Sequence, residues 1–219
     1  MAAPALPIYG HEVVKTPNLE KLADKGVVFD NSYCNFPLCA PSRFSMLTGQ
    51  LCSRIGAYDN GAEFPASIPT FIHHLRTLGY HTCLSGKMHF IGPDQLHGFE
   101  ERLTMDIYPP DFIWTGDWEA GIVSFGDVDN VLNAGLCQRS MQIDYDEEVF
   151  HCAEKKIYDI ARMKEMPPFF LTISFTHPHD PYTVTPTYWN RYNHNDIDMP
   201  AVKKIPMEEL DVHSRGIYE

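Results

Sequence analysis

Residues 39–49 read CAPSRFSMLTG, and this stretch has the marks of a short helix with a reactive group at its entrance. Pro41 suits the first helical position, because no helix carbonyl needs an N–H there, and Gly49 suits the position just past the end. Cys39 then lies at the helix N-terminus, where unpaired backbone N–H groups and the helix dipole favour an anion. The pattern alone leaves two interpretations of Cys39: a reactive thiol at an anion site, or an inert buried cysteine beside a helix.

Helices and apolar strands alternate on both sides of this stretch. Apolar periodicity and capping residues predict three helix–strand pairs: residues 16–26 with 27–29, 70–78 with 80–84, and 145–163 with 169–175. Apolar strands between helices are typical of a mainly parallel sheet sandwiched by helices, so we expect an α/β fold. Ligands of such sheets bind beyond the carboxyl ends of the strands. The segment 109–142, rich in Gly, Asp and aromatic residues, is expected to form a long loop or lid over that edge.

Length and composition narrow the class of protein. The chain has 219 residues, 44% hydrophobic content and a formal net charge of -12, which suits a folded α/β domain and argues against a nucleic-acid-binding protein. The six cysteines form no CxxC pair, which argues against a disulfide scaffold and against structural zinc. No signal-peptide pattern or membrane-spanning stretch is visible. We therefore expect a cytoplasmic protein, with a periplasmic or secreted one left open in case an N-terminal segment is missing.

Two motifs give the chain a family resemblance. Residues 39–49 match C-x-P-S-R-x-x-x-(L/M)-T-G at every fixed position, and residues 79–89 match G-Y-x-T-x-x-x-G-K-x-H. Both motifs, in this order, are those of the type I, formylglycine-dependent sulfatases, which the chain therefore resembles. The segments similar to choline sulfatases in particular are 85–90, 92–103 and 174–182. The resemblance implies an alkaline-phosphatase-like sulfatase fold, of which residues 1–219 would be a partial N-terminal catalytic domain.

The resemblance implies a role for each matched residue. A formylglycine-generating enzyme would oxidise Cys39 to formylglycine, whose hydrate attacks the sulfate ester. The further catalytic residues carried over are Arg43, which steadies the gem-diol, Lys87, which binds a sulfate oxygen and the aldehyde oxygen, and His89, which positions or deprotonates the diol. His179 matches the histidine that binds sulfate and protonates the leaving group, with His177 as the alternative.

The substrate that the resemblance implies is choline sulfate. Trp114 matches a tryptophan that packs on the trimethylammonium group in choline sulfatases, although an aromatic side chain packed under the loop would give the same pattern. The chain then departs from those enzymes, with Gly126-Asp127 in place of a His-Asn pair, so another small sulfate ester stays an alternative. Two further alternatives are a phosphonate or phosphate monoester hydrolase of the same superfamily and a truncated sulfatase fragment without catalysis.

The resemblance also implies a divalent cation beside Cys39 in its formylglycine form, with Ca²⁺ as the first choice and Mg²⁺ or Mn²⁺ as alternatives. The other metal ligands are expected from a first strand and from C-terminal segments that this chain lacks. The isolated chain is therefore expected to be inactive, to hold no such ion and to aggregate. The implied partners are the sulfate-ester substrate, the maturation enzyme and, at full length, further copies of the chain, but neither nucleic acid nor a membrane.

Overall fold

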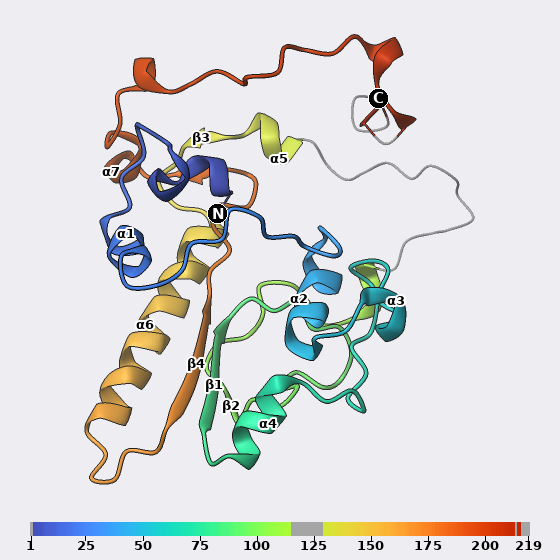
Figure 1. Cartoon of the computed structure of the whole chain (residues 1–219), viewed down its shortest axis with the longest axis vertical. Coiled ribbons are helices and arrows are strands. Elements are labelled where there is room, and N and C mark those ends of the chain that lie inside the picture. Colours follow the sequence, from blue (N-terminus) through green and yellow to red (C-terminus); the bar gives the residue numbers. More distant parts are fainter. Residues whose placement is uncertain (1, 115–128, 213, 216–219) are drawn as a thin grey trace. The chain divides into compact units, whose positions relative to one another are not determined.

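The computed structural model of the chain describes residues 2–114, 129–212 and 214–215 (Figure 1). Its internal contacts divide the chain into two compact units. Unit 1 comprises Met1–Tyr33, Ile122–Gln138 and Asp180–Glu219, and unit 2 comprises Cys34–Gly121 and Arg139–His179. Every site residue predicted from the sequence belongs to unit 2.

Helices and strands alternate along unit 2. Its elements are α2 (Cys39–Thr48), α3 (Cys52–Ile55), α4 (Phe71–Thr77), β1 (His81–Gly86), β2 (Glu101–Arg102), the 3-10 turn η3 (Phe112–Trp114), α6 (Met141–Ala161) and β4 (Phe169–Ser174). Unit 1 contains η1 (Ala3–Ala5), η2 (Pro7–Tyr9), α1 (Pro17–Ala23), α5 (Asp129–Leu132), β3 (Gly135–Leu136), β5 (Thr183–Val184), α7 (Pro186–Trp189), η4 (His194–Asp196) and η5 (Met207–Glu209). None of the helices in the described ranges combines the length and apolar composition needed to cross a membrane.

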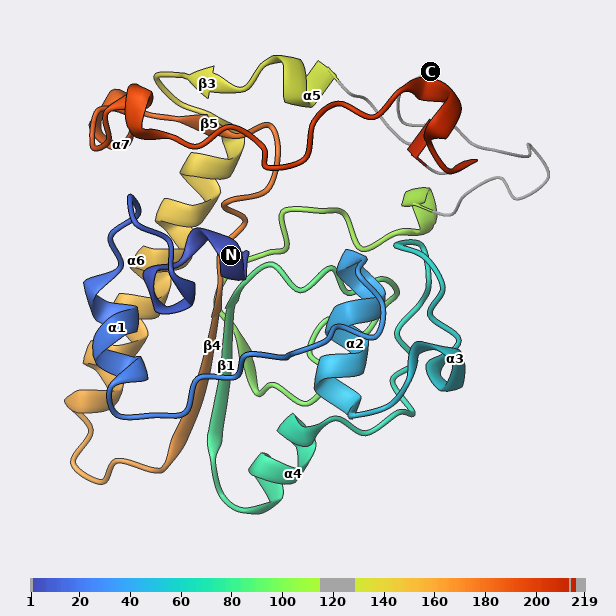
Figure 2. The same ribbon diagram turned by 45° about the horizontal axis from the view of Figure 1, so that its top comes forward.

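The sheet of unit 2 is parallel, as predicted, with the strand order β2-β1-β4. The central strand β1 pairs with β4 along its whole length, from His81 opposite Phe169 to Gly86 opposite Ser174. Both ribbon views show α6 along one face of this sheet and α2 with α4 on the other (Figure 1, Figure 2). Residues on the two faces alternate along β1, so Ser85 donates its Oγ hydrogen to the α6 carbonyl of Val149 at 2.9 Å, while Leu84 belongs to the opposite face.

The apolar core lies between β1 and the helices α2 and α4. Its buried members include Ala40, Phe44 and Leu47, which recur on one face of α2 at helical spacing. The ring of Phe44 stacks on that of Phe64 with centroids 4.3 Å apart. The helix that carries Cys39 is therefore fixed to the sheet by its buried face.

One strand prediction needs correction, and a second strand is less buried than expected. Residues 27–29 are not a strand, and Val27 and Phe29 are 77% and 67% exposed. A strand needs a ladder partner, and none of the described strands pairs with this segment. The run predicted at 169–175 does form β4, but as an edge strand of the described sheet it is only half-buried, with Ile173 41% exposed.

Two helix N-termini lie earlier in the chain than predicted. Helix α2 begins at Cys39, so Pro41 is its third residue rather than its first. This is tolerated because the N–H groups of the first turn have no helix carbonyl to pair with. Helix α6 begins at Met141, because the Ser140 side chain accepts the N–H of Ile143 and caps the helix four residues earlier than predicted. The predicted loop 109–142 thus contains η3, α5 and β3, with 115–128 outside the described residues.

Acid should destabilise unit 2 through His97. This residue is 1% exposed and stacks on Phe64 with ring centroids 4.0 Å apart. Burial lowers the pKa of His97 to about 4, against an opposing effect of Asp94. Between pH 6.5, about the ordinary pKa of histidine, and about pH 4, the unfolded chain binds a proton at this residue that the folded chain does not. The free energy of unfolding therefore falls as the pH falls through this range, by up to about 1.4 kcal/mol per pH unit.

The measurement is the free energy of unfolding against pH for the full-length protein that contains this chain and for its His97→Asn variant. Asn tolerates the left-handed backbone that His97 adopts at φ 42°. In the variant, the slope of the unfolding free energy against pH should be smaller by the contribution of about one proton over this range. The exposed residue His74 offers a matched control, His74→Asn, which should keep the slope of the unmodified chain. An unchanged slope in His97→Asn would contradict the assignment.

Candidate active site

The carboxyl ends of two adjacent parallel strands are followed by four of the predicted site residues, Lys87, His89, His177 and His179. Gly86 ends β1 and Ser174 ends β4, and these two residues are partners in the ladder. Lys87 follows β1 directly, and the loop after β4 carries His177 and His179. The edge at which ligands were expected therefore carries the residues predicted to bind them.

The two strand ends approach each other closely because Gly86 has no side chain. A Cβ at this position would lie 2.1 Å from the carbonyl oxygen of Ser174, and the backbone φ of Gly86 is 113°. The close approach lets the N–H of Lys87 donate to that same carbonyl at 2.9 Å. Any other residue would push the strands apart at the point where Lys87 leaves the sheet.

Arg43 ties helix α2 to both strand ends. Its Nη1 donates to the carbonyl oxygen of Lys87 at 2.8 Å and to Oγ of Ser174 at 3.1 Å. Cys39 and Arg43 are four residues apart on α2 and so share a face of the helix. The guanidinium therefore fixes the position of Cys39 relative to the sheet edge.

Cys39 is the first residue of α2 and is partly exposed. The N–H of Ala40 donates to Oδ1 of Asn60 at 3.0 Å, and Pro41 has no N–H to offer. The expectation of an anion site built from open backbone donors is therefore weakened in the first turn of this helix. The positive charge near this edge comes instead from the side chains of Arg43 and Lys87.

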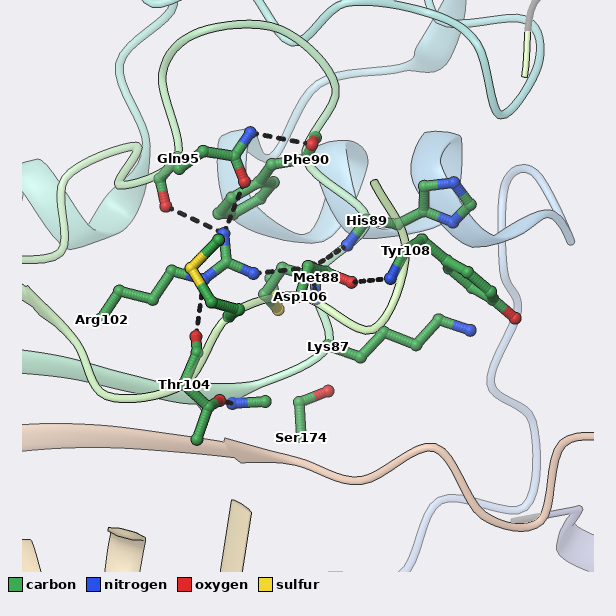
Figure 3. A network of polar contacts seen from close by, with 12 residues as sticks. Lys87, Met88, His89, Phe90, Gln95, Arg102, Thr104, Asp106, Tyr108 and Ser174 are labelled. Atoms are coloured by element: carbon green, nitrogen blue, oxygen red, sulfur yellow. Dashed lines mark hydrogen bonds and ion pairs between the residues drawn. The ribbon is translucent and has the colours of Figure 1, made fainter. Parts of the chain in front are cut away.

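A buried ion pair holds the loop that follows β1 (Figure 3). Oδ2 of Asp106 accepts the N–H groups of Met88 at 2.8 Å and of His89 at 2.9 Å, and lies 2.7 Å from Nη2 of Arg102. The side chains of Asp106 and Arg102 are 3% and 9% exposed. Gln95 supports the pair, because its Oε1 accepts from Nη1 of Arg102 at 2.7 Å. Hydrogen bonds around both charges make such a buried pair tolerable.

His89 is held at the bend of this loop. Its backbone φ is 56°, a left-handed conformation that the N–H bond to Asp106 stabilises. The residue is 2% exposed, and burial followed by the positive charge of Lys87 lowers the pKa of His89 to about 4. Its imidazole is therefore neutral at neutral pH and able to accept a proton.

Tyr108 brings three of the predicted residues together. Nζ of Lys87 lies 4.3 Å from the centroid of the Tyr108 ring, and Figure 3 shows the two side chains next to each other. The Tyr108 ring is 4.9 Å from that of His89 and 6.4 Å from that of His179. The cluster formed by Lys87, His89, His179 and Tyr108 is called the Tyr108 cluster below.

The two histidines after β4 have different surroundings. Nδ1 of His177 lies 2.7 Å from Oδ2 of Asp146 on α6, and the same oxygen accepts the N–H of His177 at 3.0 Å. The other oxygen of Asp146 accepts from the N–H and Oγ1 of Thr176. His179 instead contacts Tyr108. The geometry therefore includes His179 in the Tyr108 cluster and assigns His177 a carboxylate that orients its ring.

Trp114 is the last residue of η3, and its side chain lies outside the described part of the structure. The segment Gly126-Asp127, where the chain departs from choline sulfatases, also lies outside the described residues. The contact between Trp114 and a cationic substrate therefore stays a prediction.

Sequence reasoning missed three residues of this site: Asp106, Tyr108 and Asp146. Asp146 lies within the predicted helix 145–163, where a carboxylate normally indicates a solvated face. Asp106 and Tyr108 lie in a loop between predicted elements, where no periodicity marks a residue that turns inward. A loop carboxylate seventeen residues after His89 has no local signal that would identify its partner.

The donors at this edge do not suit the divalent cation that the family resemblance implies. Ca²⁺ requires about six to eight oxygen ligands, whereas the Tyr108 cluster presents nitrogen donors and an ammonium group. The two carboxylates that contact the site, Asp106 and Asp146, already accept hydrogen bonds from backbone, side-chain or guanidinium donors. Among the described residues of this site, Cys39 in its formylglycine form is the one that the resemblance predicts to bind the cation.

Comparisons with known proteins address the family and the fold of the chain. A family model described as Sulfatase matches residues 1–218. The chain is 47% identical over 94% of its length to the choline-sulfatase of Rhizobium meliloti, and 36% identical over 53% of its length to an N-acetylglucosamine-6-O-sulfatase of Bacteroides thetaiotaomicron. It covers 42% of the first relative and 21% of the second, so it spans less than half the length of either.

Solved structures with the same fold include a phosphonate monoester hydrolase of Agrobacterium radiobacter, with a TM-score of 0.56 and 21% identity over 85% of this chain and 40% of that one. A 2-O GAG sulfatase gives a TM-score of 0.55 and 20% identity over 82% of this chain and 33% of that one. At these identities the likeness concerns the fold alone, and it confirms the alkaline-phosphatase-like α/β architecture predicted from the sequence. Because the family model covers the chain almost from end to end, this chain belongs to the sulfatase family.

Proposed function

We propose that the protein containing this chain hydrolyses a small sulfate monoester, choline sulfate first among them, with a nucleophile made from Cys39. The observation that carries the proposal is the Tyr108 cluster at the carboxyl edge of the sheet, next to the helix that carries Cys39 and Arg43. The choline-sulfatase relative at 47% identity supports the choice of substrate.

Cleavage of a sulfate monoester at sulfur requires a nucleophile, positive charge near the sulfuryl oxygens and a proton for the leaving alkoxide. Formylglycine at position 39, once hydrated, would supply two hydroxyl groups on one carbon. One hydroxyl attacks sulfur and displaces the alcohol, and deprotonation of the other regenerates the aldehyde and releases sulfate. A single water molecule then restores the hydrate.

The residues of the chain meet the remaining requirements. Lys87 is 2% exposed, so its charge would act on the sulfuryl oxygens with little screening by water. The neutral imidazole of His89 would accept the proton of the attacking hydroxyl. His179 would donate a proton to the leaving alkoxide, with His177 as the alternative donor. Arg43 would hold the gem-diol beside the sheet edge, since it already joins α2 to Lys87.

The first prediction of this proposal concerns the modification of Cys39. In protein made together with a formylglycine-generating enzyme, the tryptic peptide 26–43 should carry an aldehyde in place of the thiol at position 39. Mass spectrometry of this peptide checks the prediction, and Cys34 in the same peptide should stay a thiol as an internal control. An unmodified Cys39 in material from a host that matures sulfatases would refute the mechanism, as would sulfatase activity retained by Cys39→Ala in the full-length protein.

A second prediction concerns Asp106 as a positioning residue. Asp106→Asn keeps an acceptor for the N–H groups of Met88 and His89 but leaves Arg102 buried without its counter-charge. A misplacement of Lys87 and His89 of about 1 Å should lower kcat of the full-length enzyme by up to about 100-fold with little change in KM. Steady-state kinetics measure the split between the two constants.

The matched control for this carboxylate-to-amide change is Glu147→Gln, which removes an exposed ion pair with Arg139. It should leave both kinetic constants near those of the unmodified enzyme, because exposed pairs contribute little. A kcat of Asp106→Asn equal to that of the control would show that the loop needs no such support.

A third prediction addresses the substrate. Trp114→Ala should raise KM for choline sulfate about tenfold and affect an aryl sulfate much less, because a cation–π contact exists only with the cationic substrate. Phe112→Ala, in the same turn η3, is the control and should affect both substrates alike. Equal losses on both substrates in Trp114→Ala would favour an aromatic packed under the loop. Faster turnover of a phosphonate ester than of either sulfate would favour the hydrolase alternative instead.

A further inference from the structure

A second group of metal-binding residue types lies at the opposite end of β1. His81 and Cys83 are two residues apart on this strand, so their side chains share one face of the sheet. Glu101 on β2 is the ladder partner of Cys83. One ligand atom from each of these three residues lies within 4.8 Å of the other two. Ser85, the next residue on the same face, bonds to α6, which identifies this as the α6 face.

Neighbouring side chains orient two of these donors. Nδ1 of His81 lies 3.2 Å from Oε2 of Glu100, which favours a proton on Nδ1 and a lone pair on Nε2. Nε2 is buried, has no hydrogen-bond partner among the described residues and lies 3.4 Å from Oε1 of Glu101. Lys156 from α6 binds the other oxygen of Glu101, with Nζ 2.6 Å from Oε2. A carboxylate on the far nitrogen of a histidine is the usual support of a metal-binding histidine.

We propose that His81, Cys83 and Glu101 form a binding site for a transition-metal dication of the Zn²⁺ or Co²⁺ class, which joins β1 to β2. One nitrogen, one sulfur and one oxygen donor are the mixture that zinc accepts in tetrahedral sites. Ca²⁺ and Mg²⁺ prefer oxygen ligands and would not select this set. The site lies at the amino end of the strand, away from Lys87, and is independent of the function proposed above.

The spacing of the donors fits such an ion. Ligand atoms in a tetrahedral zinc site lie about 3.3 to 3.8 Å apart, as follows from metal–ligand bonds of about 2.0 to 2.3 Å. The separation of 3.4 Å between Nε2 of His81 and Oε1 of Glu101 falls in this range. The remaining separations, up to 4.8 Å, need a small side-chain adjustment of Cys83 or its neighbours. An open pocket of about 290 Å³, lined in part by His81, Glu101 and Lys156, gives room for a water molecule as the fourth ligand.

Metal binding at this site must release a proton. Cys83 is fully buried in the metal-free chain, and a free cysteine thiol is protonated at neutral pH. A metal ion binds the thiolate, so the proton goes to the solvent and the affinity should rise with pH.

The test is a titration of the full-length protein that contains this chain with Co²⁺, followed by the sulfur-to-cobalt charge-transfer absorption. We expect one tightly bound equivalent with a thiolate band, and release of about one proton per metal in weakly buffered solution. Zn²⁺ at a free concentration about 100-fold above its own Kd should displace Co²⁺. It should also raise the Tm of the protein by about 5 to 10 °C.

The variants Cys83→Ser and Glu101→Gln should each weaken binding by at least about tenfold, and Glu100→Gln by about 10- to 100-fold through the orientation of His81. Cys152→Ser on α6 is the matched control and should keep the band and the affinity. Circular dichroism verifies folding, and Glu101→Gln keeps the test decisive if Cys83→Ser does not fold, because the Glu101 side chain is 43% exposed. A thiolate band that persists in Cys83→Ser, unchanged affinity in Glu101→Gln, or no bound equivalent at all would overturn the proposal.

Discussion

The close approach of β1 and β4 at Gly86 and Ser174 is the constraint on which the rest of the site depends. A side chain at residue 86 would meet the Ser174 carbonyl at 2.1 Å, so the strands reach their hydrogen-bonding distance only with glycine. The N–H of Lys87 then pairs with Ser174, and Arg43 can bridge the Lys87 carbonyl and the Ser174 hydroxyl. Two strands and one helix are thereby joined at one point, next to Cys39.

The Asp106–Arg102 ion pair is the second constraint on the site, because it holds the loop after β1 in place without regular secondary structure. An ion pair at 3% and 9% exposure contributes little net stability, since desolvation offsets the attraction. Its effect is positional: one carboxylate oxygen fixes two successive N–H groups and with them the left-handed backbone of His89. Loss of one charge would leave the other buried and uncompensated, so this loop has few alternative conformations.

The sequence predicted those features that local patterns determine. Capping residues and periodicity correctly indicated α1, α4 and β1, and the helix–strand order correctly indicated a parallel sheet with the motif residues at its carboxyl edge. The strand predicted at residues 27–29 was wrong because strand formation depends on a distant ladder partner, which apolar content does not reveal. Asp106 and Asp146 could not be predicted because each acts through contacts about 17 to 31 residues away in the chain.

The surroundings of the histidines give them different chemical properties. His89 and His97 are buried and held neutral, and a neutral imidazole can accept a proton. His81 and His177 instead contact Glu100 and Asp146 through Nδ1, which directs the other ring nitrogen toward a ligand or a proton partner. His81 begins β1 and His89 lies three residues beyond its end at Gly86, and the buried residues 82–86 keep water from the strand between them. A metal ion at the amino end would therefore strengthen the pairing of β1 with β2 at the end of the strand opposite Lys87.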